Sequence, residues 1–286
     1  MKTYKIGNLK LKNRFLLAPM LEPNDIAFRI LCKGAGCALT YTGMINPLTQ
    51  KKIILDDKPA IQLFTNNVRG IKEFIKKYDK MVSLWDFNLG CPSKLSKRLG
   101  HGAFMHKDFE ALDRIFKEIR KSTKKPCTIK LRKSQQALEI VKLAETNGFD
   151  AIGIHPRTFS QGYSGEPDYQ FALDLKKSTK LPVIFSGNVS AKNASKILED
   201  FEFIFLGREA IGNPNIFLEL QGKKPKYLFK NYLRLAKKYS LNWKQIKYQA
   251  MNFTKKLQGA KELRSSISSA RSSNEIEKIY NHLKVH

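Results

Sequence analysis

Eight short β-rich segments that alternate with amphipathic helical stretches constrain this chain more than any other feature of its sequence. The segments are residues 14–20, 37–44, 60–64, 82–88, 127–132, 151–155, 182–187 and 203–207. Helical periodicity fills the intervals, as in DFEALDRIFKEIRKST (108–123) and SQQALEIVKLAETNG (134–148). Strands that alternate with helices favour parallel βαβ units. Closing eight such units predicts an α/β fold, a (β/α)8 TIM barrel, which usually takes about 250 residues.

The main alternative is an open, doubly wound sheet. No GxGxxG segment follows the first predicted strand, which weakens this alternative. The alternating pattern ends at GNPNIF (212–217), and no strand is expected after it. We therefore predict two domains, a TIM barrel over residues 1–218 and a small all-helical domain over residues 219–286.

The charge of the chain is strongly positive. It carries 52 Lys and Arg against 25 Asp and Glu, a formal net charge of +27. Such an excess favours a polyanionic partner, such as nucleic acid, although a lysine-rich source proteome is the alternative. Residues 219–286 contain 16 Lys and Arg against 4 Asp and Glu, a net +12. There, aromatic residues at helical spacing predict the core of a small bundle, and the lysines predict a solvated face for an RNA backbone.

Several classes of protein are excluded by what the sequence lacks. Four scattered cysteines do not make a disulfide framework, and without a CxxC pair we expect no metal site. No apolar run approaches the roughly 20 residues of a membrane span. The first residues, MKTYKIGNLKLKNRF, lack the apolar core of a signal peptide. We therefore expect a soluble protein of a reducing cytoplasm, with no membrane partner, and a monomer.

Lys130 is expected to point into the barrel. Side chains alternate along a strand, so Thr128, Lys130 and Arg132 share the face opposite to Ile129 and Leu131. If the apolar pair packs against the helices, Lys130 projects inward. A buried lysine without a partner is costly. The partner is either Asp86, in an internal salt bridge, or an anionic ligand.

Other polar residues fall near strand ends, where TIM-barrel enzymes have their active sites. Gln62, Asn88 and His155 would form, with Lys130, a ring of donors and acceptors suited to a polar, planar ligand.

Glycines follow the seventh and eighth strands, in the two loops that commonly bind phosphate in this architecture. They are Gly187 in FSGNVS (185–190) and Gly207, with Arg208, in FLGREAIGNP (205–214). The residues therefore predict a phosphorylated, heteroaromatic cofactor. FMN fits better than pyridoxal phosphate, which remains the alternative because Lys130 would serve for its Schiff base.

A single cysteine lies at the tip of the fourth strand. In WDFNLGCPSKLSKRLGHGAF (85–104), Cys91 follows Asn88 by three residues, on a loop with Lys94, Lys97 and Arg98. Nearby positive charge favours the thiolate and suits a nucleophile, whereas a thiol can instead protonate a carbon centre. The remaining cysteines, Cys32, Cys37 and Cys127, fit an inert, buried role.

Five segments, in order, resemble motifs of the dihydrouridine synthases, flavin enzymes that reduce uridine in tRNA. They are LAPM (17–20), FNLGCPSKLSKRLGHGAFM (87–105), IHPRTFSQGYSGEPD (154–168), GNV (187–189) and GREAIGNPNIF (207–217). The resemblance covers residues 14–217 and continues more loosely through the helical tail. One departure is Thr42-Gly43-Met44, where the family commonly has an acidic residue before the methionine.

The resemblance implies a tRNA-dihydrouridine synthase in which NADPH reduces FMN. The reduced flavin would transfer hydride from N5 to uracil C6 while Cys91, as general acid, protonates C5 of a flipped-out base. The flavin ring would contact Pro19 and Met20, with Gln62 and Lys130 at its polar edge. The residues implied for the ribityl and phosphate side are His155, Gly187, Asn188, Gly207 and Arg208. Those implied near the base or the tRNA backbone are Asn88, Lys94, Arg132, Arg157 and Gln161.

Two other functions account for part of the sequence. A related FMN-dependent barrel oxidoreductase acting on a small pyrimidine would need neither the +27 charge nor the basic tail. A non-catalytic RNA-binding barrel would not need the intact GCPSK around Cys91.

Overall fold

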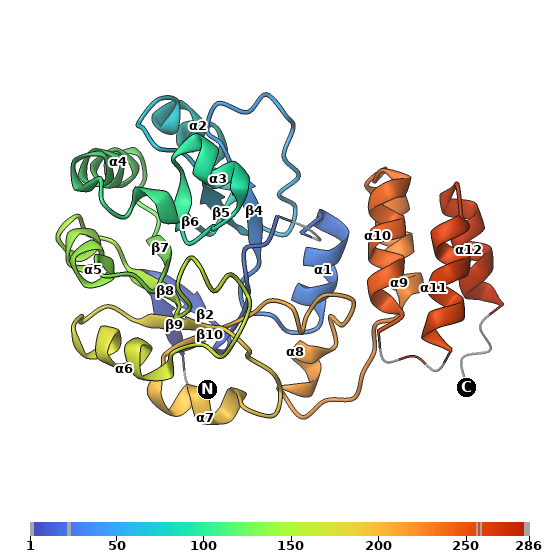
Figure 1. Cartoon of the computed structure of the whole chain (residues 1–286). Helices are drawn as coiled ribbons and strands as arrows, with labels where there is room; N and C mark the ends of the chain where they lie inside the picture. The colour runs from blue at the N-terminus through green and yellow to red at the C-terminus, as the bar shows by residue number, and fades with distance from the viewer. Residues whose placement is uncertain (1–2, 22–23, 256, 258, 283–286) are drawn as a thin grey trace.

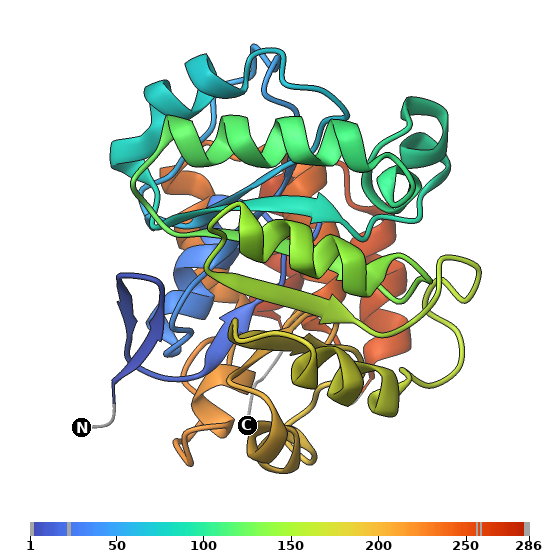
Figure 2. The same cartoon turned by 90° about the vertical axis from the view of Figure 1, so that its left-hand side faces the viewer.

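The structure is a computed structural model that describes residues 3–21, 24–255, 257 and 259–282. Within these residues, eight parallel strands curl into a barrel (Figures 1 and 2). The strands are β3 (Phe15–Leu17), β4 (Tyr41–Ile45), β5 (Ala60–Leu63), β6 (Leu84–Leu89), β7 (Cys127–Arg132), β8 (Ala151–His155), β9 (Val183–Ser186) and β10 (Phe203–Leu206). Their order is β3-β10-β9-β8-β7-β6-β5-β4, and a parallel bridge between Leu16 and Leu39 nearly closes the ring. The eight predicted strands and the TIM barrel are confirmed, and the open doubly wound sheet is wrong.

Helices lie outside the barrel and connect successive strands (Figure 2). They are α1 (Ile26–Gly34), α2 (Ile71–Tyr78), α3 (Lys94–Leu99), α4 (Phe109–Ser122), α5 (Ala137–Thr146), α6 (Tyr169–Lys177), α7 (Ala194–Asp200) and α8 (Ile216–Glu219), with 3-10 turns η1 (Asp79–Met81) and η2 (Gly102–Met105). Aspartates start α1, α4 and α6, where Asp25, Asp108 and Asp168 each accept a backbone N–H at 2.9–3.0 Å. Such caps satisfy donors that the first turn of a helix leaves unpaired.

The barrel interior is apolar toward the N-terminal ends of the strands and polar toward their C-terminal ends. Its apolar part includes Leu16, Leu84, Ile184 and Phe205, whereas a separate and larger core lies between the strands and the outer helices. Gly153 makes room inside, because a Cβ there would lie 3.1 Å from Cγ of Lys130 and 3.0 Å from the Phe205 ring. The barrel therefore has polar side chains at the C-terminal ends of its strands and apolar side chains below them.

An N-terminal hairpin, β1 (Tyr4–Ile6) and β2 (Leu9–Leu11), was not predicted. Ile6 and Leu11 are buried and join the apolar part of the barrel interior, and the Tyr4 ring contacts Phe203. The hairpin therefore covers the N-terminal end of the barrel. Its three-residue strands are too short to show a period of two.

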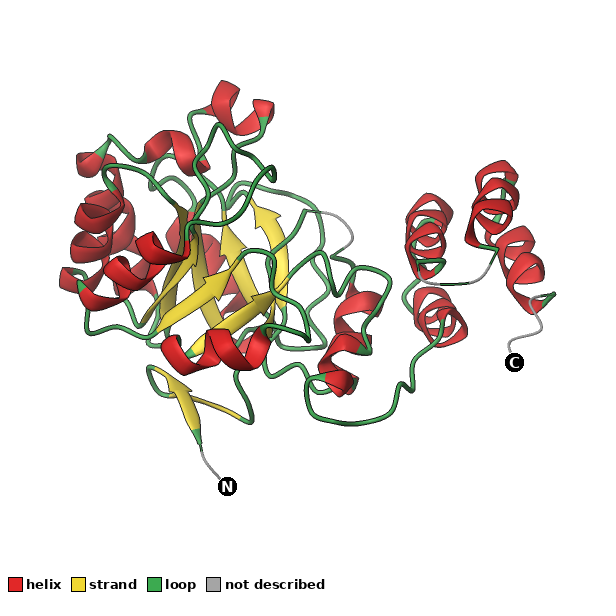
Figure 3. Ribbon diagram, turned by 60° about the horizontal axis from the view of Figure 1, so that its bottom comes forward, coloured by secondary structure: helices red, strands yellow, loops and turns green. Residues whose placement is uncertain are grey.

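The tail forms four helices beside the barrel (Figure 3), α9 (Phe229–Lys238), α10 (Trp243–Phe253), α11 (Ala260–Ser269) and α12 (Ser273–Asn281). Its predicted helical character is confirmed over the described residues. Stacked rings of Phe229 and Tyr280, 4.0 Å apart, and the buried Tyr232 and Phe253 form its core. Both predicted domain ranges also include residues outside the described ones, and their limits stay predictions. In the described part of the chain, no helix has the length and apolarity to cross a membrane.

A half-buried carboxylate joins the bundle to the barrel. Asp25 caps α1 and accepts hydrogen bonds from Gln249 at 2.8 Å, Gln245 at 3.0 Å and the Tyr232 hydroxyl at 3.4 Å. Burial raises the pKa of Asp25, while hydrogen bonds from Gln249, the Phe28 N–H and Gln245, and the charge of Arg29, lower it. Helices α9 and α10 are thereby attached to the first strand–helix connection of the barrel.

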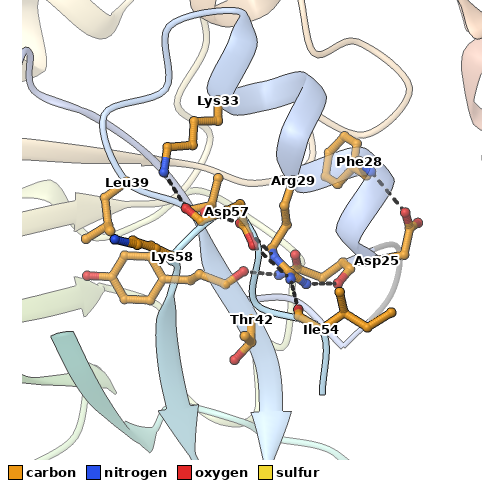
Figure 4. Close-up of polar contacts among 12 residues, drawn as sticks. Asp25, Phe28, Arg29, Lys33, Leu39, Thr42, Ile54, Asp57 and Lys58 are labelled. Carbon is orange, nitrogen blue, oxygen red and sulfur yellow. Dashed lines mark hydrogen bonds and ion pairs between the residues drawn. The ribbon is translucent and has the colours of Figure 1, made fainter. Parts of the chain in front are cut away.

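One turn further along α1, Arg29 forms a buried ion pair with Asp57 (Figure 4). Two nitrogens of Arg29 meet the two carboxylate oxygens at 3.0 and 3.1 Å, and the Thr40 hydroxyl donates to Asp57 at 2.6 Å. Arg29 also donates to the carbonyls of Asn24 and Ile54. Both charges are thus fully hydrogen-bonded, as a buried pair requires.

Candidate active site

A chain of hydrogen bonds runs from the barrel interior to the loop that carries Cys91. Asp86 accepts from the Thr128 hydroxyl at 2.5 Å and from Nε2 of Gln62 at 2.6 Å. Oε1 of Gln62 accepts from Nδ2 of Asn88 at 2.7 Å, and Oδ1 of Asn88 accepts the N–H of Cys91 at 3.0 Å. Neighbouring strands supply these residues, since Gln62 pairs with Asp86 and Asp86 with Thr128 in register. Each amide is therefore held in one orientation.

Asp86 is an unusual carboxyl group because it is buried and forms no salt bridge with any residue that the structure describes. Burial raises its pKa to about 7, against the hydrogen bonds from Thr128 and Gln62 and the charge of Lys130. Asp86 was considered in the sequence only as a salt-bridge partner, so its role at the start of this chain was missed. The sequence feature that could have indicated this role is an aspartate at an inward position of β6, two residues before Asn88.

We expect this carboxyl group to change how stability depends on pH. A folded-state pKa of about 7 exceeds the ordinary 3.8, so the contribution of Asp86 is fully present below about pH 4 and is lost as pH rises through about 7. Relative to Asp86→Asn, the wild type should lose on the order of 4 kcal/mol of unfolding free energy over this window. Urea unfolding of both proteins between pH 4.5 and 8 measures the difference. The exposed Glu110→Gln is the matched control, and parallel curves for wild type and Asp86→Asn would contradict the assignment.

Lys130 has no ionic partner in the described part of the structure. No ion pair with Asp86 is formed, so the internal salt bridge is not observed. Burial and Arg132 lower the pKa of Lys130 to about 8, while Asp86 and Cys91 act in the opposite direction. Its ammonium group lies 5.8 Å from the centre of the Phe205 ring. It is therefore a donor available to a ligand.

All four cysteines lie within the described residues. Cys91 is half-buried, whereas the other three are buried. Its thiol lies 3.4 Å from the Ser93 hydroxyl, which caps α3 by accepting the Ser96 N–H at 3.1 Å. Gly102, at φ +63°, passes so close that a Cβ would lie 3.0 Å from the Cys91 carbonyl oxygen. Burial raises the pKa of both Cys37 and Cys127 to about 12, as expected for inert thiols.

His155 is neutral, and its one ring N–H proton is on Nδ1. Burial, followed by the charges of Lys130, Arg132, Arg157 and Arg208, lowers its pKa to about 2. Arginine only donates, so Nε2 of His155 accepts from Arg157 at 3.0 Å and the proton is on Nδ1. Nδ1–H has no acceptor within the described residues and is a second donor for a ligand.

Two buried arginines hold the loop after β8. Arg157 donates to the carbonyls of Ser164 and Gly165 and to Asn188. Arg132 donates to Gly90 at 2.8 Å and to Gly162 at 2.7 Å, which ties this loop to the Cys91 loop.

The other residues implied near the RNA are placed differently. Gln161 accepts from the backbone of Thr158 within the loop after β8, and Lys94 is exposed at the start of α3. A substrate role for Arg132, Arg157, Gln161 and Lys94 stays a prediction. For the two arginines, the structure adds a positioning role.

The predicted phosphate residues lie together. Asn188 accepts from Arg208 at 2.7 Å and from Arg157 at 3.0 Å, and Arg208 is exposed. Gly187 has φ +130°, and a Cβ there would lie 3.1 Å from both His155 and Pro167. Gly207 is not required on steric grounds, because a Cβ would make only ordinary contacts of 3.7 Å or more.

Pro19 and Met20 are half-buried at the end of β3, on the same rim. A Cβ at Gly207 would lie 3.9 Å from the Met20 sulfur, which places β3 beside β10 at the mouth. A Cβ at Gly43 would lie 2.8 Å from the Met20 carbonyl oxygen. A side chain at Gly43 would therefore require the backbone at Met20 to shift.

The mouth thus combines unpartnered donors at Lys130 and His155 with an exposed arginine beside a glycine loop. These features fit a planar, anionic ligand that accepts hydrogen bonds. Over the residues that the structure describes, no group of three His, Cys, Asp or Glu side chains could hold a metal ion.

Comparison with known proteins adds to this geometry. The family model described as "Dihydrouridine synthase (Dus)" matches residues 16–284. The "tRNA-dihydrouridine synthase B" of Pasteurella multocida is 30% identical over 235 residues, 74% of this chain and 70% of that protein. The protein of the same name from Pseudomonas aeruginosa is 27% identical over 77% of this chain and 72% of its own length. A structure of morphinone reductase in complex with tetrahydroNAD, at 12% identity, superposes with a TM-score of 0.55 over 81% of this chain and 93% of its own, a likeness of fold alone.

Proposed function

Because the chain belongs to the dihydrouridine synthase family, we propose that it reduces uridine in tRNA to 5,6-dihydrouridine, using FMN and NADPH. The observation that carries this proposal is the placement of Cys91. Its half-buried thiol lies at the barrel mouth, and the Asp86–Gln62–Asn88 chain fixes its backbone. Across the same mouth, Lys130 offers a donor without a protein partner.

The residues of the mouth fit FMN. Pro19 and Met20 would lie against its ring, and Gln62 and Lys130 would bond its polar edge. His155, Gly187, Asn188, Gly207 and Arg208 would hold its ribityl and phosphate groups. Bound there, FMN would supply the hydride for the uracil ring after accepting electrons from NADPH.

The protein's own side chains do the rest. Cys91 donates a proton to C5 of the uracil ring. Asn88 keeps the Cys91 loop in place through the N–H of Gly90 and of Cys91. Arg132 ties that loop to the one after β8, which closes over the mouth from the other side.

The tail provides a second contact with RNA. Exposed cations on the bundle include Lys230, Arg234, Lys237, Lys244 and Lys261. We assign tRNA backbone binding to residues 219–286 and cofactor binding to residues 1–218. The bundle approaches the mouth, because a Cβ at Gly212, in the loop after β10, would lie 2.0 Å from the Asn252 carbonyl oxygen of α10.

An absorption experiment tests the function. Protein loaded with FMN and desalted should keep a flavin spectrum that NADPH bleaches and unmodified tRNA restores. Affinity for tRNA should fall by at least about tenfold between 50 and 200 mM salt, because bound cations release counterions. Recovery with free uridine but not tRNA would favour the small-pyrimidine enzyme. A protein that never retains FMN would leave an RNA-binding barrel.

A further inference from the structure

A groove lies beside the mouth and is not used by the chemistry above. It consists of two adjoining depressions, of about 280 and about 490 Å³, that share Lys133, Ser134 and Phe159. Its walls come from η2, from the segment after β7 and from the loop after β8. We call it the lateral groove.

The lateral groove presents aromatic rings to solvent. Phe159, in the loop after β8, keeps 43% of its surface exposed. A ligand that covered this ring would gain free energy from the apolar surface that it removes from water. Phe104 from η2 contacts Phe159 edge to face, with ring centres 4.6 Å apart, and Phe171 lines the far end. An aromatic face supported in this way suits the stacking of a nucleobase, whatever its identity.

Its charged lining is cationic. Arg132 and Lys107 line the first depression and Lys133 lines both, and no Asp or Glu lines either. Lys133 pairs with Asp168 at the start of α6, whereas Lys107 is exposed and has no ion pair among the residues described. An aromatic floor with a cationic edge complements a base and its phosphate.

Hydrogen bonds connect the groove to the Cys91 loop. His106, in its floor, contacts the Leu89 carbonyl oxygen at 2.6 Å and the Ser134 hydroxyl at 2.7 Å. The Ala103 N–H in its wall donates to the Cys91 carbonyl oxygen at 3.4 Å. Arg132 links Gly90 to the Thr158 carbonyl of the opposite wall. The groove is therefore connected directly to the loop that carries Cys91.

We propose that the lateral groove binds the nucleotide adjacent to the target uridine in the RNA chain, with its base on Phe159 and its phosphate near Lys107. This inference rests on the proposed function and specifies how the substrate is held. Under this inference the barrel binds two nucleotides, the flipped uridine and the nucleotide next to it.

Phe159→Ala tests the inference by direct binding of tRNA at fixed salt. Loss of one stacked base should weaken binding about 5- to 100-fold, while the rate of flavin reduction by NADPH stays unchanged. Phe159→Tyr should restore binding. Met81→Ala, 42% exposed before β6 at the other end of the barrel, is the matched control and should bind as the wild type does.

A second arm uses RNA in which the nucleotide on either side of the target uridine is abasic. For one side, the abasic change should weaken wild-type binding but have no further effect in Phe159→Ala. Independent effects on both sides, or wild-type affinity in Phe159→Ala, would overturn the inference. So would slower reduction by NADPH with unchanged RNA affinity, since the groove would then hold the coenzyme. Phe159-dependent binding without any turnover by the wild type would overturn the proposed function, and with it the adjacency to a target uridine, while the groove would still be shown to bind a nucleotide.

Discussion

Cys91→Ala should lose nearly all RNA reduction while flavin binding, flavin reduction by NADPH and tRNA affinity stay close to wild type. A positioned general acid contributes about 100- to 10,000-fold, and alanine removes the proton without disturbing the backbone that Asn88 holds. The thiol makes one hydrogen bond, to Ser93, so folding should be little affected. Single-turnover mixing of reduced protein with tRNA measures the step directly.

Two further variants test whether the loss is due to the acidity of the Cys91 thiol. Cys91→Ser keeps a hydroxyl that is a weaker acid, and its rate should fall between those of wild type and alanine. Ser93→Ala removes the contact to the thiol and the α3 cap, and should cost far less than Cys91→Ala. A Cys91→Ala rate within tenfold of wild type would remove the general-acid assignment.

Arg29→Met should destabilise the protein by about 3–5 kcal/mol, the cost of leaving a buried charge unpaired. The Asp57 side chain has no exposed surface, and Arg29 supplies two of its hydrogen bonds. Urea unfolding at pH 7 measures the loss.

Two comparisons test the cause. Adding Asp57→Asn to Arg29→Met removes the stranded charge and should recover part of the loss. Lys117→Met breaks an exposed pair with Asp113 on α4 and should cost no more than about 1 kcal/mol. Equal losses for Arg29→Met and Lys117→Met would show that burial of the first pair contributes little.

Element positions and strand ends were predictable from the sequence, because they depend on local periodicity. The inward direction of Lys130 follows from that periodicity. The grouping of Gly187 with Arg208 follows from the barrel architecture, and the separation of Cys91 from the other cysteines follows from the glycine, proline and lysines around it. Hydrogen-bond partners were not predictable. The contact of Asp86 with Gln62 depends on the register between β5 and β6, which no segment encodes alone. The internal use of Arg157 depends likewise on the path of a loop.

The attachment of the bundle at Asp25 sets a length scale. Asp25 starts the helix that follows β3, and the end of β3 carries Pro19 and Met20 at the mouth. Because Gln245, Gln249 and Tyr232 all converge on this one carboxylate, the bundle has little freedom to slide along the barrel. Under the proposed function, this attachment would set the span between RNA bound on the bundle and the thiol of Cys91, so that substitutions on α10 would change which nucleotide reaches the thiol.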